Sequence, residues 1–208
     1  MLAPFNFTLP TQVIFGQPAL DALKAQLKAL NASRALLVSD RGLAQLGWPD
    51  RFCAELQDAG VAVATFSDVS TNPNTDEVAA GLSLAQAHGA QALIALGGGS
   101  AIDVAKAIAM LLANGGTYAD YQWGGKAITQ RSYPLIAVPT TAGTGSEVSK
   151  VMVIVDPARP FKKGVLSPLM FAHAAILDTE LTRSLPPQMT AATGMDAFVH
   201  ALEAYVGK

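Results

Sequence analysis

Along most of this chain, short apolar runs that end at polar or glycine residues alternate with longer runs of helical periodicity. Leu20, Leu23, Leu27 and Leu30, for example, recur at spacings of three and four residues, which place them on one helix face. Parallel strands need long crossover connections, and helices between strands supply them. The alternation therefore predicts an α/β fold, with a parallel sheet covered by helices on both faces.

The apolar runs predict strands at 13–16, 35–38, 61–66, 93–96 and 134–138, and the periodic runs predict helices at 20–30, 44–59, 75–88 and 100–113. The pattern changes after residue 146. We expect an extended strand over 148–156, shorter strands at 164–166 and 174–177, and a helix from Pro186-Pro187 to Tyr205. A domain boundary is expected near residue 180.

Composition excludes several functional classes. Half of the 208 residues are hydrophobic, enough for a sizeable core, and a formal charge of −2 disfavours nucleic acid as a partner. The apolar stretch 101–113 is too short to cross a bilayer, so no membrane partner is expected. The first residues lack the basic and apolar regions of a secretion signal, and Cys53 is the single cysteine. These features predict a cytoplasmic protein.

Three glycines, Gly97, Gly98 and Gly99, follow a buried strand and open a helix. Glycine lets a ligand approach the backbone closely, and a helix amino end offers free N–H groups to an anion. A pyrophosphate is the natural occupant of such a corner. The alternative is a tight turn in which Ser100 caps the helix and Asp103 completes a capping box.

An acidic residue about twenty positions after the glycines usually marks an NAD site, and none stands out here. Asp40 instead ends an earlier strand. Its carboxylate could accept hydrogen bonds from the ribose hydroxyls of adenosine and repel a 2′-phosphate. The alternative for Asp40 is an ordinary turn residue before Gly42.

The segment from Pro139 to Glu147 concentrates hydroxyl groups and two glycines at the end of the strand 134–138. The carboxyl ends of parallel strands are where α/β sheets bind ligands. The hydroxyls could therefore hold a phosphate or the ribose and nicotinamide. The alternative is a polar turn bonded to its own backbone. The hydroxyl residues are Thr140, Thr141, Thr144 and Ser146.

Asp196 and His200 lie four residues apart and share one face of the expected C-terminal helix. A carboxylate and an imidazole at this spacing can bind one divalent metal, and they discriminate little between iron, zinc, cobalt and nickel. The alternative is a solvated Asp–His pair. Two ligands fall short of a complete site.

Together these motifs resemble the iron-containing (group III) alcohol dehydrogenase family. The resemblance rests on Gly97-Gly98-Gly99-Ser100-x-x-Asp103-x-Ala105-Lys106, on Pro139-Thr140-Thr141-Ala142-Gly143-Thr144-Gly145-Ser146-Glu147, and on Gly194-Met195-Asp196-Ala197-x-x-His200-Ala201-x-Glu203. It implies a dinucleotide-binding α/β domain over 1–180, followed by the start of an all-helical metal-binding domain at 181–208.

The resemblance also implies roles for matching residues. It implies NAD as cofactor, a divalent metal with iron favoured over zinc, an alcohol or aldehyde substrate, homo-oligomers, and no catalytic side chain beyond the metal ligands. Asp40 would contact the adenosine ribose and favour NAD over NADP. The other implied positions are Asn72, Gly97, Gly98, Gly99, Ser100, Thr140, Thr141, Thr144, Ser146 and Lys162 for the cofactor, and Asp196 and His200 as two of four metal ligands.

Members of that family are nearly twice as long, so we expect this chain to bind NAD but to turn over alcohol weakly or not at all. A first alternative is a glycerol dehydrogenase or dehydroquinate-synthase-like enzyme of the same architecture. A second is a non-catalytic nucleotide-binding or assembly module, which would associate through the apolar side of the last helix. That side is formed by Met189, Ala192, Met195, Val199 and Leu202.

Overall fold

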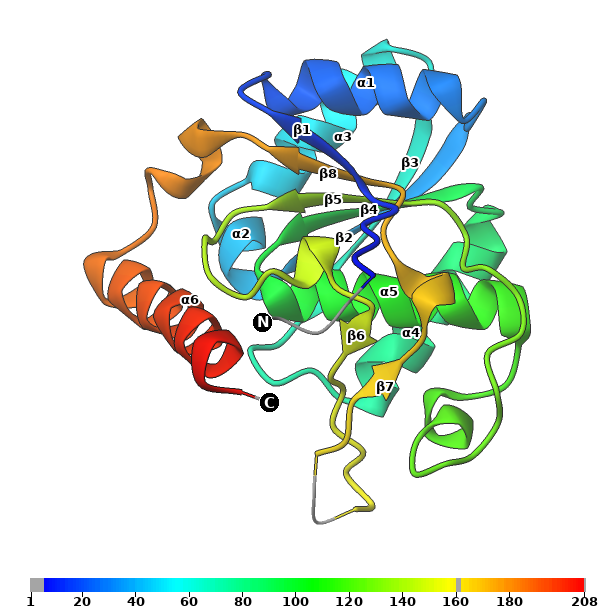
Figure 1. Cartoon of the computed structure of the whole chain (residues 1–208). Helices are drawn as coiled ribbons and strands as arrows, with labels where there is room; N and C mark the ends of the chain where they lie inside the picture. Colours follow the sequence, from blue (N-terminus) through cyan, green and yellow to red (C-terminus); the bar gives the residue numbers. More distant parts are fainter. Residues whose placement is uncertain (1–5, 160–161, 208) are drawn as a thin grey trace.

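A computed structural model describes residues 6–159 and 162–207 of the chain. A six-stranded sheet forms its centre, in the order β1-β8-β5-β4-β2-β3, and every neighbouring pair is parallel (Figure 1). The predicted α/β fold is therefore confirmed. The strands are β1 (Gln12–Phe15), β2 (Arg34–Asp40), β3 (Ala62–Val69), β4 (Ala92–Gly97), β5 (Leu135–Pro139) and β8 (Ala174–Leu177).

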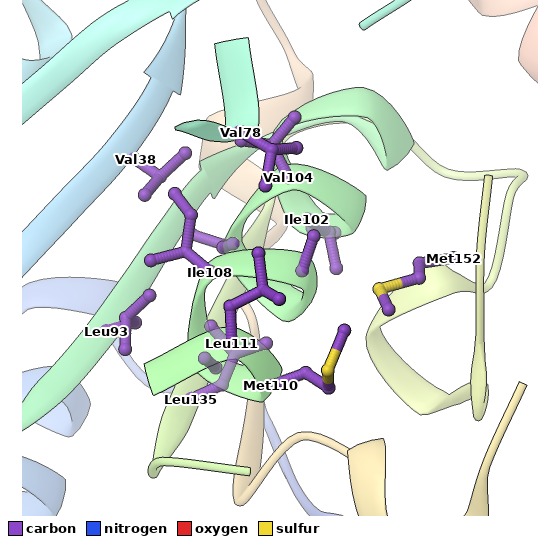
Figure 2. Close-up of a cluster of buried hydrophobic side chains, with 14 of the residues drawn as sticks. Val38, Val78, Leu93, Ile102, Val104, Ile108, Met110, Leu111, Leu135 and Met152 are labelled. Atoms are coloured by element: carbon purple, nitrogen blue, oxygen red, sulfur yellow. The ribbon is translucent and has the colours of Figure 1, made fainter. Parts of the chain in front are cut away.

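Helices cover both faces of this sheet because the central strands are apolar on both sides. All six residues of β4 are buried, as are all five of β5. One face packs against α1 (Ala19–Ala29) and α3 (Trp48–Asp58), and the other against α4 (Thr75–His88) and α5 (Gly99–Asn114). Figure 2 shows the core between the sheet and the helices α4 and α5, where Leu93 and Leu135 from the sheet meet Ile108 and Leu111 of α5.

The direction of chain winding reverses between β2 and β4, which are neighbours in the sheet. The chain leaves β2 through α2 (Arg41–Gln45) and α3 on one face, and it leaves β3 through α4 on the other. Such a reversal opens a crevice at the carboxyl ends of the two strands, the usual ligand site of doubly wound sheets. Asp40, Gly97 and Pro139 end the adjacent strands β2, β4 and β5.

The remaining elements lie outside the six-stranded sheet. Residues 146–206 contain β6 (Val151–Met152), which pairs antiparallel with β7 (Val165–Leu166), and α6 (Pro187–Val206). Four short 3-10 helices complete the described residues: η1 (Tyr118–Tyr121), η2 (Ser146–Val148), η3 (Pro168–Met170) and η4 (Thr179–Thr182). Figure 1 shows α6 set apart from the sheet, after the segment that follows β8.

The expected helix at 44–59 is wrong as a single element. The structure has α2 ending at Gln45 and α3 starting at Trp48. Gly47 between them has a left-handed φ of 73°, and Pro49 has no N–H with which to continue the first helix. Periodicity alone does not register such a break.

The expected strand at 148–156 is also mostly wrong, since only Val151 and Met152 belong to β6. Two backbone N–H groups of this segment are directed to side chains instead of to a neighbouring strand. The N–H of Val151 donates to Ser149 Oγ at 3.2 Å, and that of Val153 donates to Asp103 Oδ2 at 2.9 Å.

In the part of the chain that the structure describes, no helix has both the length and the hydropathy to cross a membrane. Residues 1–5, on which the prediction about a secretion signal partly depends, lie outside the described residues.

Phe52 belongs to the core between the sheet and the helices α1 and α3. Its side chain is 1% exposed, so its replacement tests the packing of that core. We expect Phe52→Ala to lower the free energy of unfolding by about 3–5 kcal/mol, through lost burial and a residual cavity. Urea unfolding followed by circular dichroism measures the change. Phe198→Ala on α6, where the side chain is 61% exposed, is the matched control and should change it little. Equal losses in the two variants would contradict this packing.

Candidate cofactor-binding site

The corner between β4 and α5 requires glycine. Gly97 has a φ of +155°, and a Cβ built there would lie 2.7 Å from Ala101 Cβ and 3.1 Å from Asp40 Oδ2. Any side chain at this position would therefore push against both the helix and the neighbouring strand end. The absence of a side chain brings the carboxylate of β2 next to the start of α5.

The amino end of α5 is open. Gly98 is the N-cap residue, and no side chain of the described residues caps the helix. Ser100 lies inside the first turn, and its hydroxyl donates to Thr71 O at 3.0 Å. Asp103 turns away toward residues 146–153. The capping-box alternative is therefore wrong, and the first N–H groups of this 16-residue helix remain available to an anion.

Two threonine hydroxyls of the loop after β5 face this corner. The loop is held in place by a backbone hydrogen bond of 3.0 Å from Thr140 N to Gly97 O. A Cβ on Gly98 would lie 3.3 Å from Thr141 Oγ1, and one on Gly99 would lie 3.1 Å from Thr144 Oγ1. The predicted glycine and hydroxyl motifs are thus brought together, with Thr140 itself 7% exposed.

Asp40 has a structural role at the turn after β2, in line with the alternative considered for it from the sequence. Its Oδ1 accepts a hydrogen bond of 2.9 Å from Leu43 N and caps α2. Its Oδ2 lies next to Gly97 at the crevice. One carboxylate oxygen therefore stabilises a helix end while the other is placed at the predicted ligand site.

Two further predicted residues meet although they are 90 positions apart. Lys162 Nζ donates a hydrogen bond of 2.6 Å to Asn72 Oδ1, and both side chains are exposed. Asn72 lies between β3 and α4, so this contact ties the end of β3 to the segment before β7.

A buried polar cluster beneath the corner joins Ser146, which the resemblance assigned to the cofactor, to Lys106 and Asp103, for which no cofactor contact was predicted. Lys106 of α5 is 1% exposed, and its ammonium donates to Ser146 Oγ at 3.1 Å. The Ser146 hydroxyl donates in turn to Asp103 Oδ1 at 2.5 Å. The signal available in the sequence was the presence of Asp103 and Lys106 within the otherwise apolar helix at 101–113.

Burial shifts both ionisable groups toward their neutral forms. It lowers the pKa of Lys106 from 10.5 to about 8, against the opposing charges of Asp103 and Glu147. It also raises the pKa of Asp103, although the hydrogen bond from Ser146 and the charge of Lys106 act in the other direction.

Asp196 and His200 share a face of α6, with 3.6 Å between His200 Nε2 and Asp196 Oδ1. Both are partly exposed, and the described residues contain no group of three side chains that could hold a metal ion. The helix itself contacts the loop after β5, since the carbonyl of Thr193 leaves no room for a side chain at Gly143. This Asp–His pair therefore lies on a helix that contacts the loop after β5, but two donors do not form a metal site.

Comparison with known proteins places these features in a family. The model of the family described as iron-containing alcohol dehydrogenase matches residues 10–179. The choline dehydrogenase of Bacillus subtilis is 41% identical over 98% of this chain and 51% of its own length. The NAD-dependent methanol dehydrogenase of Bacillus methanolicus is 38% identical over 98% of this chain and 53% of its own length. The chain spans about half the length of these curated relatives.

Among solved structures, the sulfoacetaldehyde reductase from Bifidobacterium kashiwanohense in complex with NAD+ superimposes with a TM-score of 0.90 at 35% identity. The match covers 98% of this chain and 54% of that one. The fold is therefore shared with solved structures over nearly the whole chain.

The lowered pKa of Lys106 predicts a pH-dependent stability. Between pH 8 and 10.5 the unfolded chain holds a proton on this lysine that the folded chain has lost, so this group makes the free energy of unfolding rise with pH. We expect the difference between the unaltered chain and Lys106→Met to rise by about 1 kcal/mol from pH 8.5 to 9.5 in urea unfolding.

Lys28→Met is the control, because Lys28 is exposed on α1 at the opposite face of the sheet. Its difference from the unaltered chain should not change over this interval. A flat difference for Lys106→Met as well would contradict the shift.

Proposed function

The chain belongs to the iron-containing alcohol dehydrogenase family, and from this we propose that it binds NAD(H) at the corner between β4 and α5. The activity that this binding serves is hydride transfer between an alcohol, or the corresponding aldehyde or ketone, and the nicotinamide. In this proposal residues 1–180 form the dinucleotide-binding domain and residues 181–208 begin a helical metal-binding domain.

The uncapped amino end of α5 carries the proposal. A pyrophosphate seated on residues 97–100 would accept hydrogen bonds from N–H groups that no described side chain occupies, and it would lie at the positive end of the helix dipole. The close approach that this requires is possible because Gly98 and Gly99 have no Cβ to fill the space beside the threonine loop, by which we mean residues 140–145 after β5.

The surrounding side chains would hold the rest of the cofactor. Asp40 Oδ2 would accept hydrogen bonds from the adenosine ribose hydroxyls and repel a 2′-phosphate. Thr141 and Thr144 would donate to the phosphates, and Thr140 and Ser146 would support them from buried positions. Lys162, aligned by Asn72, would lie toward the nicotinamide ribose.

The bound cofactor supplies the hydride acceptor or donor, and the residues of this chain bind and orient it. The relatives are named for choline, methanol and sulfoacetaldehyde, so their names do not single out one substrate. We therefore assign the substrate class as a small alcohol or aldehyde.

Asp196 and His200 would supply two ligands to a divalent metal, with iron favoured over zinc by the family. The described residues provide no third donor beside them, so no catalytic step is assigned to the metal here. Weak or absent alcohol oxidation by the 208-residue chain is the expected behaviour. The same architecture also serves glycerol dehydrogenase and dehydroquinate-synthase-like enzymes, and the complete hydroxyl motif at 139–147 favours the alcohol dehydrogenase assignment.

An assembly role is a second candidate, because the predicted apolar side of α6 is exposed. Met195 is 60% exposed, and no residue of α6 is buried. The sheet also ends at β1, where Phe15 is 71% exposed. We propose that the chain forms homo-oligomers through one of these surfaces, since large apolar patches usually mark interfaces.

Substitution of Asp40 tests the cofactor proposal. Asp40→Asn keeps an oxygen that can cap α2 but removes the charge, so we expect weaker NAD binding by about tenfold and a smaller preference for NAD over NADP. Calorimetric titration with each nucleotide measures both. Asp58→Ala, an exposed carboxylate on α3, should leave both affinities unchanged. An unchanged NAD-to-NADP ratio in Asp40→Asn would refute the role of Asp40, and no NAD binding by the unaltered chain would refute the proposed site.

Sedimentation velocity at micromolar concentration tests assembly. We expect the unaltered chain to associate, and the paired change Met195→Glu with Phe198→Glu to release monomers if α6 is the contact. Phe15→Glu should do so instead if β1 is the contact, and Gln57→Glu on the exposed side of α3 is the control. A monomeric unaltered chain would exclude the assembly role.

A further inference from the structure

Lys106 is an unusual residue for the interior of an apolar helix. Its side chain is fully covered two turns after the glycine corner, and its ammonium donates three hydrogen bonds. The acceptors are Ser146 Oγ at 3.1 Å, Ser149 Oγ at 3.3 Å and Val151 O at 2.9 Å. All three belong to the segment that follows the threonine loop.

Asp103, one turn earlier on the same helix, binds that segment from a second point. Its Oδ1 accepts from the Ser146 hydroxyl, and its Oδ2 accepts from Val153 N. The Ser146 oxygen thus receives a hydrogen bond from Lys106 and passes its own hydrogen to Asp103. Helix α5 is therefore hydrogen-bonded to residues 146–153 through one cation and one carboxylate, which share the Ser146 hydroxyl.

Ser146 also connects these hydrogen bonds to the corner between β4 and α5. The Ser146 N–H donates at 3.2 Å to Thr144 Oγ1, the oxygen that lies beside Gly99. A displacement of Ser146 would therefore move the threonine hydroxyl that faces the amino end of α5.

From these contacts we infer that Lys106 and Asp103 are positioning residues, which hold the threonine loop against the glycine corner in the geometry that receives the dinucleotide. The inference rests on the proposed NAD site. Neither residue touches the cofactor in it, and both act through Ser146 and Thr144.

The energetics of buried charges support a positioning role over a purely stabilising one. Burying a cation and a carboxylate costs desolvation that their attraction does not always offset, and apolar side chains can often replace such pairs without loss of stability. Five directional hydrogen bonds to four residues, in contrast, define where the segment 146–153 lies relative to the helix.

The positioning requires the charged lysine. Three acceptors need three N–H donors, and a neutral amine has only two. Burial lowers the pKa of Lys106 to about 8, while Asp103 on its own helix and Glu147 in η2 oppose the shift. Tyr118 of η1 carries a phenol whose pKa burial raises further, and Lys150 before β6 is exposed. One contact to the loop is therefore lost as the pH rises above 8, and NAD affinity should fall.

Lys106→Met in the full chain tests the inference, since methionine keeps an unbranched buried side chain without charge or donors. We expect calorimetry at pH 7 to give a dissociation constant for NAD raised about tenfold. Between pH 7 and 9 the constant should rise several-fold further in the unaltered chain and stay flat in the variant. Without cofactor, amide hydrogen exchange should quicken within residues 140–153. Lys28→Met is the matched control and should behave as the unaltered chain in all three measurements.

Asp103→Asn provides a second test of the positioning role if Lys106→Met does not fold. Loss of the carboxylate charge removes a cause that raises the pKa of Lys106, so the fall in NAD affinity should begin at a lower pH than in the unaltered chain. A residue that only stabilised the fold would not move this midpoint.

The outcomes separate the two proposals. Absence of NAD binding by the unaltered chain refutes the proposed site, and the positioning role with it. NAD binding that is equally tight and equally pH-dependent in the unaltered chain and in the folded variants, with unchanged exchange at 140–153, overturns the positioning role alone.

Discussion

The close approach of two loops at the carboxyl edge of the sheet depends on residues 97–99 having no side chains. At Gly97 a Cβ would collide with Ala101, and at Gly98 and Gly99 it would press on Thr141 and Thr144. Because these positions are bare, the loop after β5 lies directly against the start of α5, and Asp40 reaches the same corner from β2. Parallel strand order brings these three strand ends together, and the glycines let them touch.

Directly beneath this corner the helix α5 departs from the rule that apolar helices carry no buried charge. Asp103 and Lys106 face the segment 146–153, whose backbone does not continue as a strand. The two observations are connected, since the carbonyl of Val151 and the N–H of Val153 bond to these side chains. The polar cluster therefore accounts for part of the irregularity of this segment, and we infer that it positions the loop before it.

The comparisons and the geometry together indicate which part of the family's sequence this chain holds. The family match extends over residues 10–179, where the sheet and the glycine corner lie, and the chain spans about half the length of its curated relatives. The helix α6 contacts the loop after β5 at Gly143, but no three possible metal ligands lie together among the described residues, and its apolar side is exposed. The described residues thus bring together more of the groups expected for a dinucleotide than for a metal, which is why the proposed function centres on NAD binding.

Sequence alone determined the features that depend on neighbours in the chain. Alternating apolar and helical runs specified the parallel sheet, and the glycine triplet after a buried strand specified the corner, because periodicity and φ preferences are local. Family resemblance added positions such as Asn72 and Lys162, which no spacing rule would connect. Local signals misled at Ser100 and Asp103, where the capping-box spacing was present but the carboxylate found partners 43 and 50 residues away. Only the tertiary structure decided those partners, the burial of Lys106 and the break at Gly47, because each depends on which distant groups the packed sheet brings within hydrogen-bond reach or leaves no room to accommodate.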